Sequence, residues 1–461
     1  MEQRRRDRNA DNPSARSSSA EPTRAVVIGP YLRRGRGAQE PARAPEARLE
    51  EAVGLAQAID LTIVQSGVVL LTEIRPATFI GTGKADEVAG LVKSLEAGLV
   101  VMDCALSPVQ QRNLEKLWNA KVLDRTGLIL EIFGQRAHTR EGVLQVELAH
   151  LTYQKSRLVR SWTHLERQRG GFGFLGGPGE TQIEADRRVI AERIARIETE
   201  LESVKKRRTL HRESRKRVPY PVAALVGYTN AGKSTLFNRL TRAEVLEADM
   251  LFATLDPTLR AVALPHGAKI ILSDTVGFIS DLPTMLVAAF RATLEEVTEA
   301  DIILHVRDVS HEDTEAQRTD VQTILESLGI EASDRRIVEV WNKVDRLDAE
   351  ARRRLDNSAA RMSAQERPVA VSALTGEGIG ALIEAIEHRL TQDRTVMRIV
   401  VAAEDGAGAS WLHRHTEVLE RHVETDGRVV MTVRADPANA ALVRARFAQD
   451  GAVSDTARSL S

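Results

Sequence analysis

GYTNAGKST, running from Gly227 to Thr235, is the stretch that decides the fold of this chain. It matches the pattern GxxxxGK[ST], in which glycines let the backbone wrap around phosphate oxygens, the lysine neutralises the β- and γ-phosphates and the hydroxyl ligates Mg²⁺. The apolar run PVAALVG before it indicates a buried strand, and STLFNRLT after it indicates a helix. A tight glycine turn before a helix is the structural alternative, which the lysine and serine in register disfavour. The sequence therefore predicts a phosphate loop in an α/β fold.

A second motif, NKVD, occupies Asn342 to Asp345 and follows the apolar strand IVEVW. The Asp345 carboxylate can accept hydrogen bonds from both the ring N–H and the exocyclic amine of guanine, whereas adenine lacks this pair of donors. We expect Asn342 to tie this loop to the phosphate loop and the stem of Lys343 to cover one face of the base. Alone, an NKxD match is more often a helix-capping loop. In order after a phosphate loop, it predicts a site for GTP or GDP.

Three further segments complete the predicted site. Asp274 to Gly277 follow the strand KIILS, so the carboxylate can reach Mg²⁺ through water and the Gly277 N–H can face the γ-phosphate. Phe252 to Asp256 form the expected first switch, where Thr254 is the chosen Mg²⁺ ligand and Thr258 competes with it. Ser372 to Leu374 follow PVAV and should offer a backbone N–H to the guanine oxygen. The predicted nucleotide-binding residues are Gly227, Tyr228, Thr229, Asn230, Ala231, Gly232, Lys233, Ser234, Thr235, Phe252, Ala253, Thr254, Leu255, Asp256, Asp274, Thr275, Val276, Gly277, Asn342, Lys343, Val344, Asp345, Ser372, Ala373 and Leu374; the catalytic groups among them are Lys233, Thr254 and Gly277, and the Mg²⁺ ligands are Ser234, Thr254 and, through water, Asp274.

Phe278 stands directly after this DTVG segment, where many regulatory GTPases carry the glutamine that orients the attacking water. A phenyl ring cannot orient water. We therefore expect slow hydrolysis by the chain alone, with a partner, a rearranged segment or a cation completing the site. Asn230 is where some GTPases hold a K⁺ ligand, and an ordinary loop hydrogen bond is the equal alternative.

Composition is that of a multi-domain globular protein. The 461 residues include 43% apolar ones, enough for several cores, and the net charge of −1 does not select a class of partner. Cys104 is the single cysteine, which excludes an intramolecular disulfide and a cysteine-cluster metal site and suits a reducing cytosol. Because no apolar run reaches about 18 residues, no membrane span is expected. We expect a monomer in the cytoplasm, either free or peripheral at a membrane.

The pattern of the chain changes at four places. The last segment should contain a helix across WLHRHTEVLERH, Trp411 to His422. The five predicted segments are a basic disordered tail at 1–24, an α/β domain at 25–142, an antiparallel helical hairpin at 143–217, a GTPase domain with a doubly wound, mostly parallel sheet at 218–392, and a small α/β appendage at 393–461.

The segment GGFGFLGGPGETQIEADRR, Gly170 to Arg188, joins the two helices of the predicted hairpin. Its glycines favour a mobile loop, and such loops are often functional. Phe172 and Phe174 within it, and the arginines that precede it, suit unstacked RNA bases and phosphates. A charge run is nevertheless usually a solvated face.

These motifs together resemble the HflX family of bacterial GTPases, over roughly residues 25 to 395. The resemblance implies an α/β domain, a helical hairpin and a GTPase domain that binds the large ribosomal subunit, in proteins thought to split or rescue stalled ribosomes. A hydrophobic residue after DxxG is expected in this family, so Phe278 fits it. The resemblance rests on five stretches of sequence: LDRTGLILEIFGQRAHTREGVLQVELAHLTYQ, GGPGETQIEADRR, GYTNAGKST, FATLDPT and DTVGFI. It implies phosphate contacts for Gly227 to Ser234, Mg²⁺ contacts for Ser234 and Thr254, γ-phosphate contacts for Asp274 to Gly277 and guanine contacts for Asn342 to Asp345.

Three functions stay open at this point. The first is a ribosome-associated GTPase that uses Mg²⁺, and K⁺ if Asn230 holds it. The second is a GTPase of ribosome assembly or RNA modification. The third is a nucleotide-gated scaffold that barely turns over, for which Phe278 is the supporting residue. An ATPase is the weakest alternative, because Asp345 is wrong for adenine.

Overall fold

The computed structural model describes residues 23–33, 43–168, 178–215, 220–242, 252, 258–265, 269–280, 282, 291–363, 366–391, 395–425, 427–435, 437–447 and 453–455. The predicted tail up to residue 22, the glycine-rich stretch 170–177 and the switch residues 253–256 lie outside these ranges. The described residues up to Ser203, with Phe252, form one compact unit, and the others form a second. None of the helices in the described ranges is both long and apolar enough to cross a membrane.

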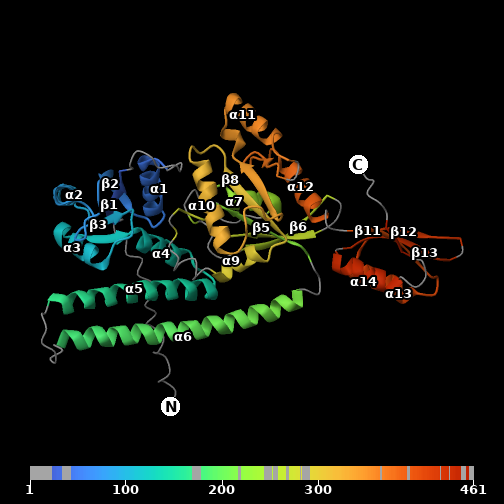
Figure 1. The fold of residues 1–461 in the computed structure, drawn as a ribbon, viewed down its shortest axis with the longest axis horizontal. Helices are drawn as coiled ribbons and strands as arrows, with labels where there is room; N and C mark the ends of the chain where they lie inside the picture. The colour runs from blue at the N-terminus through green and yellow to red at the C-terminus, as the bar shows by residue number, and fades with distance from the viewer. Residues whose placement is uncertain are drawn as a thin grey trace, which may run out of the picture. The chain divides into compact units, whose positions relative to one another are not determined.

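The first unit begins with a four-stranded parallel sheet in the order β2-β1-β3-β4 (Figure 1). Seven consecutive residues of the central strand are buried, so its sequence RAVVIGPYL is apolar throughout rather than alternating. Ser107 and Gln110 form a capping box that fixes the start of the third helix. The elements are β1 (Arg24–Leu32), α1 (Pro45–Gln57), β2 (Thr62–Leu71), α2 (Thr82–Ser94), β3 (Leu99–Met102), α3 (Pro108–Trp118), β4 (Lys121–Asp124) and α4 (Arg125–Arg136).

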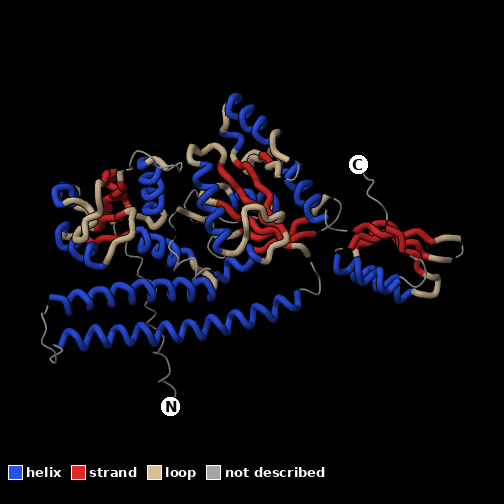
Figure 2. The backbone as a smooth tube through the Cα atoms, in the orientation of Figure 1, coloured by secondary structure: helices blue, strands red, loops and turns tan. Residues whose placement is uncertain are grey.

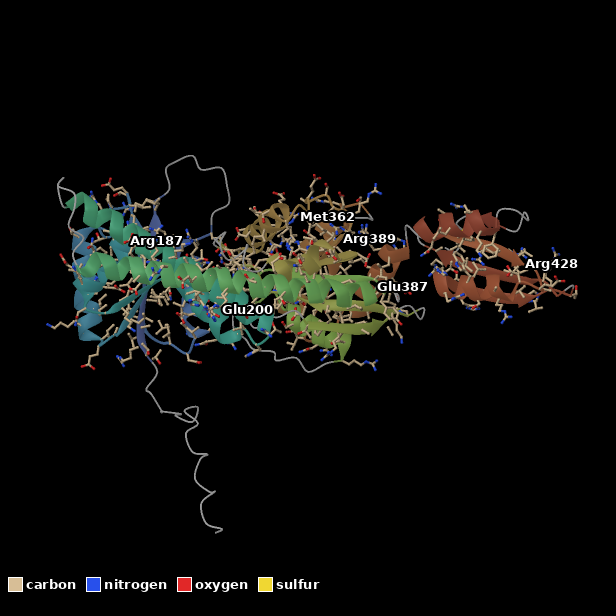
Figure 3. All side chains as sticks on the ribbon, turned by 90° about the horizontal axis from the view of Figure 1, so that it is seen from below. Arg187, Glu200, Met362, Glu387, Arg389 and Arg428 are labelled. Atoms are coloured by element: carbon tan, nitrogen blue, oxygen red, sulfur yellow. The ribbon has the colours of Figure 1, made fainter. Side chains whose placement is uncertain are left out.

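Two long helices, α5 (Arg140–Gln168) and α6 (Pro178–Arg215), follow this sheet. Ion pairs join Arg193 to Glu147 and Arg140 to Glu200, so the two helices run antiparallel, as the apolar seams predict. Figure 3 labels Arg187 and Glu200 along α6. The predicted loop was too long, because residues 178–188 are already helical. A proline in the first turn of a helix needs no N–H, so Pro178 starts α6 rather than extending the loop.

The second unit contains a six-stranded sheet in the order β10-β9-β8-β5-β7-β6. Figure 2 draws strands in red and helices in blue. Every neighbouring pair is parallel except β6 and β7, which confirms the predicted α/β class with a mostly parallel sheet. All seven residues of β8 are buried, as a strand covered on both faces requires. The elements are β5 (Val222–Gly227), α7 (Lys233–Thr241), β6 (Thr258–Ala263), β7 (Lys269–Asp274), α9 (Arg291–Thr298), β8 (Ile302–Asp308), α10 (Thr314–Ser327), β9 (Ile337–Asn342), the 3-10 helix η1 (Val344–Arg346), α11 (Ala349–Ala360), β10 (Val369–Ala370) and α12 (Ile379–Thr391).

The last part of the chain folds as an antiparallel sheet in the order β12-β13-β11-β14, with two helices. The helix predicted across Trp411–His422 is wrong in its second half, because α13 ends at His415 and Glu417–Val423 is a strand. Its backbone pairs with β13 in an antiparallel hairpin, and this pairing overrides local helix propensity. The elements are β11 (Thr395–Val401), α13 (Gly406–His415), β12 (Glu417–Val423), β13 (Val429–Ala435), α14 (Pro437–Phe447) and β14 (Val453–Asp455).

Candidate nucleotide site

The predicted phosphate loop connects the end of β5 to the start of α7. A Cβ atom at Gly227, where φ is 151°, would lie 2.2 Å from the Val306 carbonyl oxygen, so only glycine fits there. At Gly232, where φ is 89°, it would lie 2.3 Å from Asn342 Nδ2. Both motif glycines are therefore required by close approach to a neighbouring strand end or loop. The turn wraps at the N-terminus of α7, where backbone N–H groups favour an anion.

Lys233 lies inside this turn with its side chain buried. Its ammonium donates a hydrogen bond to the carbonyl oxygen of Tyr228 at 2.8 Å. Burial lowers the pKa of Lys233 to about 8, and the charge of Lys343 acts in the same direction while Asp274 opposes it. A buried ammonium whose charged form is disfavoured would gain from phosphate oxygens, which supply the missing negative charge.

Two oxygen ligands suited to Mg²⁺ meet beside Lys233. The Ser234 hydroxyl donates to Asp274 Oδ2 at 2.9 Å, and Asp274 is the last residue of β7. No cluster of three or more His, Cys, Asp or Glu in the described ranges could hold a metal. Ser234 and Asp274 offer oxygens of the kind that bind Mg²⁺, which usually takes one or two protein oxygens together with water and substrate phosphates. Thr258 is the register partner of Asp274 across β6 and β7, so it stays a competitor of Thr254 for the second hydroxyl ligand.

The segment after Asp274 packs closely against the phosphate loop. A Cβ atom at Gly277 would lie 3.0 Å from Lys233 Nζ and 3.0 Å from Thr229 Cγ2, so this backbone fits only as glycine without a shift of its neighbours. Phe278 is 1% exposed and forms a parallel β-bridge with Tyr228. Its ring is therefore packed in the interior, and it leaves the task of orienting water to another group.

The NKVD loop joins the site through Asn342. Its side-chain amide donates to the Ala231 carbonyl oxygen at 2.8 Å and accepts from the Ala373 N–H at 3.0 Å. One side chain thus connects the phosphate loop with the loop Ser372 to Leu374. Lys343 adopts φ 65° and pairs with Asp308 at 2.7 Å, and Asp345 is exposed in η1. The structure brings these segments to one edge of the sheet, and their contacts with guanine stay a prediction.

Two supporting residues were missed by the sequence analysis. Asp308 ends β8 and orients Lys343, and a carboxylate at the end of the buried strand IILHVRD was the available signal. Arg239, in α7, donates to the carbonyl oxygens of Ala373 and Leu374. No sequence pattern indicates that contact, because it depends on how the sheet folds.

Phe252 belongs to the first unit, whereas the segments above belong to the second. It is 2% exposed and packs edge-on against Phe133 in the first unit, with ring centroids 4.8 Å apart. Of the predicted first switch, Phe252 to Asp256, only Phe252 lies within the described ranges. The structure places its ring in an apolar contact with Phe133, and its contact with a nucleotide stays a prediction.

Asn230 is exposed at the turn of the phosphate loop, with φ 57°. No hydrogen bond joins its side chain to a residue in the described ranges, and both roles expected for it stay predictions. Asparagine tolerates this left-handed conformation better than most residues. Its amide oxygen is available to a cation.

Family models match four consecutive parts of the chain. They describe a GTP-binding GTPase N-terminal region at 46–134, a GTP-binding GTPase middle region at 136–215, a 50S ribosome-binding GTPase at 222–343 and an HflX C-terminal domain at 357–455. Together these models cover most of the chain. The third model ends at residue 343, so Val344 and Asp345 lie between the third and the fourth, and the loop Ser372 to Leu374 falls in the fourth.

Curated relatives align over most of their own length. A GTPase HflX of Magnetococcus marinus is 50% identical over 372 residues, which are 81% of this chain and 84% of that protein. A GTPase HflX of Escherichia coli is 47% identical over 361 residues, which are 78% of this chain and 83% of that protein. Among solved structures, a GTP-binding protein from Sulfolobus solfataricus in complex with GDP is 23% identical, covers 80% of this chain and 99% of its own, and has a TM-score of 0.44.

Proposed function

The chain belongs to the HflX family and is a GTPase, and from this premise we propose that it binds the large ribosomal subunit in its GTP form and leaves it after hydrolysis. Its work there would be to split or rescue stalled ribosomes. A role in ribosome assembly uses the same nucleotide cycle and is the nearest alternative. This function requires GTP, Mg²⁺ and ribosomal RNA as partners. In this proposal the protein works as a monomer in the cytoplasm.

The match of residues 222–343 to a 50S ribosome-binding GTPase is the observation that carries this proposal. The candidate site supports the nucleotide part of it. Lys233 and Gly277 would face the phosphates, Ser234 and Asp274 would hold Mg²⁺ directly and through water, and Asp345 would select guanine. Bound Mg²⁺ would neutralise charge that develops on the β- and γ-phosphate oxygens.

The burial of Phe278 supports the dependence on a partner. Since this ring is packed in the interior, the chain alone lacks a side chain at that position to orient the attacking water. The exposed Asn230 amide could hold K⁺ beside the phosphates, where a cation would stabilise the developing charge. We therefore propose slow hydrolysis by the free protein and faster hydrolysis on the subunit.

The same burial favours one second function, a nucleotide-gated scaffold with very low turnover. Such a protein would bind RNA or a ribosomal particle in the GTP form and release it by nucleotide exchange. The two functions differ in a single measurable property, which is whether the particle raises the rate of hydrolysis.

GTP hydrolysis by the purified protein with and without large subunits, in K⁺ and in Na⁺ buffer, is the test. We expect strong stimulation by subunits in K⁺, a smaller rate in Na⁺, and loss of the K⁺ effect in Asn230→Ala. Stimulation in neither buffer would contradict the ribosomal function and support the scaffold. Separating the subunits by sedimentation, with GTP or a non-hydrolysable analogue, then tests splitting: if whole ribosomes stay intact with both, the assembly role is favoured.

A further inference from the structure

Tyr228 contacts two functional parts of the site at once. Its backbone carbonyl accepts the hydrogen bond from the Lys233 ammonium at 2.8 Å. Its side-chain hydroxyl accepts a hydrogen bond from the backbone N–H of Ser280 at 2.9 Å, two residues beyond Phe278. The residue is 4% exposed, so both contacts are shielded from water. None of the nucleotide motifs requires a hydroxyl at this variable position of GxxxxGK[ST].

Two backbone hydrogen bonds lie beside the tyrosine contact. The Thr229 N–H donates to the Phe278 carbonyl at 2.7 Å, and the Phe278 N–H donates to the Gly227 carbonyl at 3.0 Å. With the bond from Ser280, three hydrogen bonds join the phosphate loop to residues 278–280. We call this set the clasp. The bond to the tyrosine hydroxyl depends on a side chain, so a substitution can remove it.

We propose that the Tyr228 hydroxyl is a positioning group for GTP hydrolysis, which holds the segment after Asp274 in register with the phosphate loop. The proposal rests on the GTPase activity and not on the ribosomal function. The clasp fixes the backbone on the C-terminal side of Gly277, and Asp274 at the end of β7 fixes it on the N-terminal side. Gly277 has little room to move, because its nearest neighbours are Lys233 and Thr229.

The position of Gly277 decides where its N–H points. A donor aimed at charge that develops in the transition state loses much of its effect when it shifts by a fraction of an ångström. A chain with glutamine after DxxG has a second means of orienting the reaction. This chain has Phe278 packed inside, so its backbone geometry carries more of that task.

Tyr228→Phe tests the proposal, because it keeps the ring and deletes the hydroxyl. We expect kcat for GTP, measured without ribosomal subunits, to fall by about two- to tenfold, the range that corresponds to one net hydrogen bond. The KM for GTP and the affinity for GDP should stay within about twofold, since the phosphate loop itself is unchanged. An unchanged kcat, or a loss confined to KM, would overturn the proposal.

Tyr31→Phe is the matched control. It deletes another buried tyrosine hydroxyl, one that donates to Asp103 at 2.7 Å in the N-terminal sheet. It should leave kcat unchanged, which separates positioning from the general effect of a lost buried hydroxyl. Ser280→Pro removes the donor from the other side, and combined with Tyr228→Phe it should cause no further loss. GDP affinity reports whether that proline variant is folded, and additive losses would contradict a shared bond.

The result of the Tyr228→Phe test does not depend on whether the protein binds the large ribosomal subunit. Hydrolysis without subunits tests the clasp, whereas the ratio of rates with and without subunits tests ribosome binding. A normal ratio with a reduced basal rate in Tyr228→Phe would support both.

Discussion

The four-stranded N-terminal sheet and the six-stranded sheet both have charged groups at the carboxyl ends of parallel strands, but the charges have different partners in the two sheets. In the N-terminal sheet, Arg125 lies between Asp103 and Glu51, with contacts of 2.5 and 2.7 Å. Burial opposes its charge, but these two carboxylates together raise the pKa of Arg125 above its ordinary value. In the six-stranded sheet, no carboxylate in the described ranges forms an ion pair with Lys233, and its pKa is lowered.

The difference separates a structural cluster from a functional one. A buried charge matched by opposite charges stabilises the fold it belongs to and has little left to offer a ligand. A buried charge matched by a backbone carbonyl gains most when an anion arrives. This is a physical reason to place the nucleotide at Lys233 and to assign no nucleotide to the Arg125 cluster.

Asp345→Asn should have the largest effect on ligand choice. The amide cannot accept from both donors of guanine, whereas it can donate to the carbonyl that xanthine has in place of the guanine amine. We expect the preference for GTP over xanthosine triphosphate to change by on the order of 10⁴-fold. Competition against a fluorescent GDP measures it. Unchanged GTP affinity would contradict the assignment of Asp345 to guanine, and the six-stranded sheet would then lose its part in the comparison as the nucleotide site.

Arg125→Met should cause the largest loss of stability. It leaves Asp103 and Glu51 buried without their cation, which costs about 3–5 kcal/mol in the free energy of unfolding of the first unit. Urea unfolding measures the loss. Adding Asp103→Asn and Glu51→Gln should recover part of it, because no unpaired charge then stays buried. If Arg125→Met lowered kcat per folded molecule, the cluster would not be purely structural.

Lys233→Ala should have the opposite effect to Arg125→Met, with a large loss of rate and little loss of stability. We expect kcat to fall by on the order of 10²- to 10³-fold, the usual effect of removing one preorganised group that stabilises transition-state charge. Since the fold disfavours the charge of Lys233, the free energy of unfolding should not fall in parallel. Single-turnover hydrolysis and urea unfolding of the same preparation measure both. A large loss of stability with little loss of rate would mean that Lys233 is a structural group and not a functional one.

Among these predictions, we expect the smallest effect for the pH dependence of GTP binding. The folded pKa of Lys233 is about 8, below the ordinary 10.5, so the free protein loses this charge as pH rises through 8. Binding should weaken by about fourfold between pH 7 and 8.5, while Lys233→Ala should show no such slope. The effect on stability runs the other way: the free energy of unfolding should rise with pH between about 8 and 10.5, where the unfolded chain holds the extra proton. A flat profile in the parent protein would mean that the ammonium is not buried as described.

The parts of the site that the sequence predicts are those fixed by short-range spacing. Gly227 and Gly232 are set by the phosphate-loop pattern, and the structure gives the reason, because a Cβ at either would collide with a neighbouring group. Asn342 was expected to reach the phosphate loop, and its amide lies 2.8 Å from the Ala231 carbonyl. Local motifs carry this information because each strand end they follow could be recognised from its apolar run.

The parts that could not be predicted depend on pairing between distant segments. Asp308 meets Lys343 only because β8 and β9 are neighbours, and the Tyr228 hydroxyl meets Ser280 only because the segment after β7 returns to the phosphate loop. The strand Glu417–Val423 was taken for helix although its partner lies close to it in the sequence. Its partner strand begins six residues later, and its local composition does not exclude a helix.

Helix α6 contains 38 residues, and its length has a mechanical consequence. At a rise of about 1.5 Å per residue it extends for roughly 57 Å. A change of about 10° in its direction at one end would displace the other by about 10 Å, close to the diameter of a helix with its side chains. A small change of direction at one end of α6 can thus become a displacement large enough to enter or leave a crowded surface.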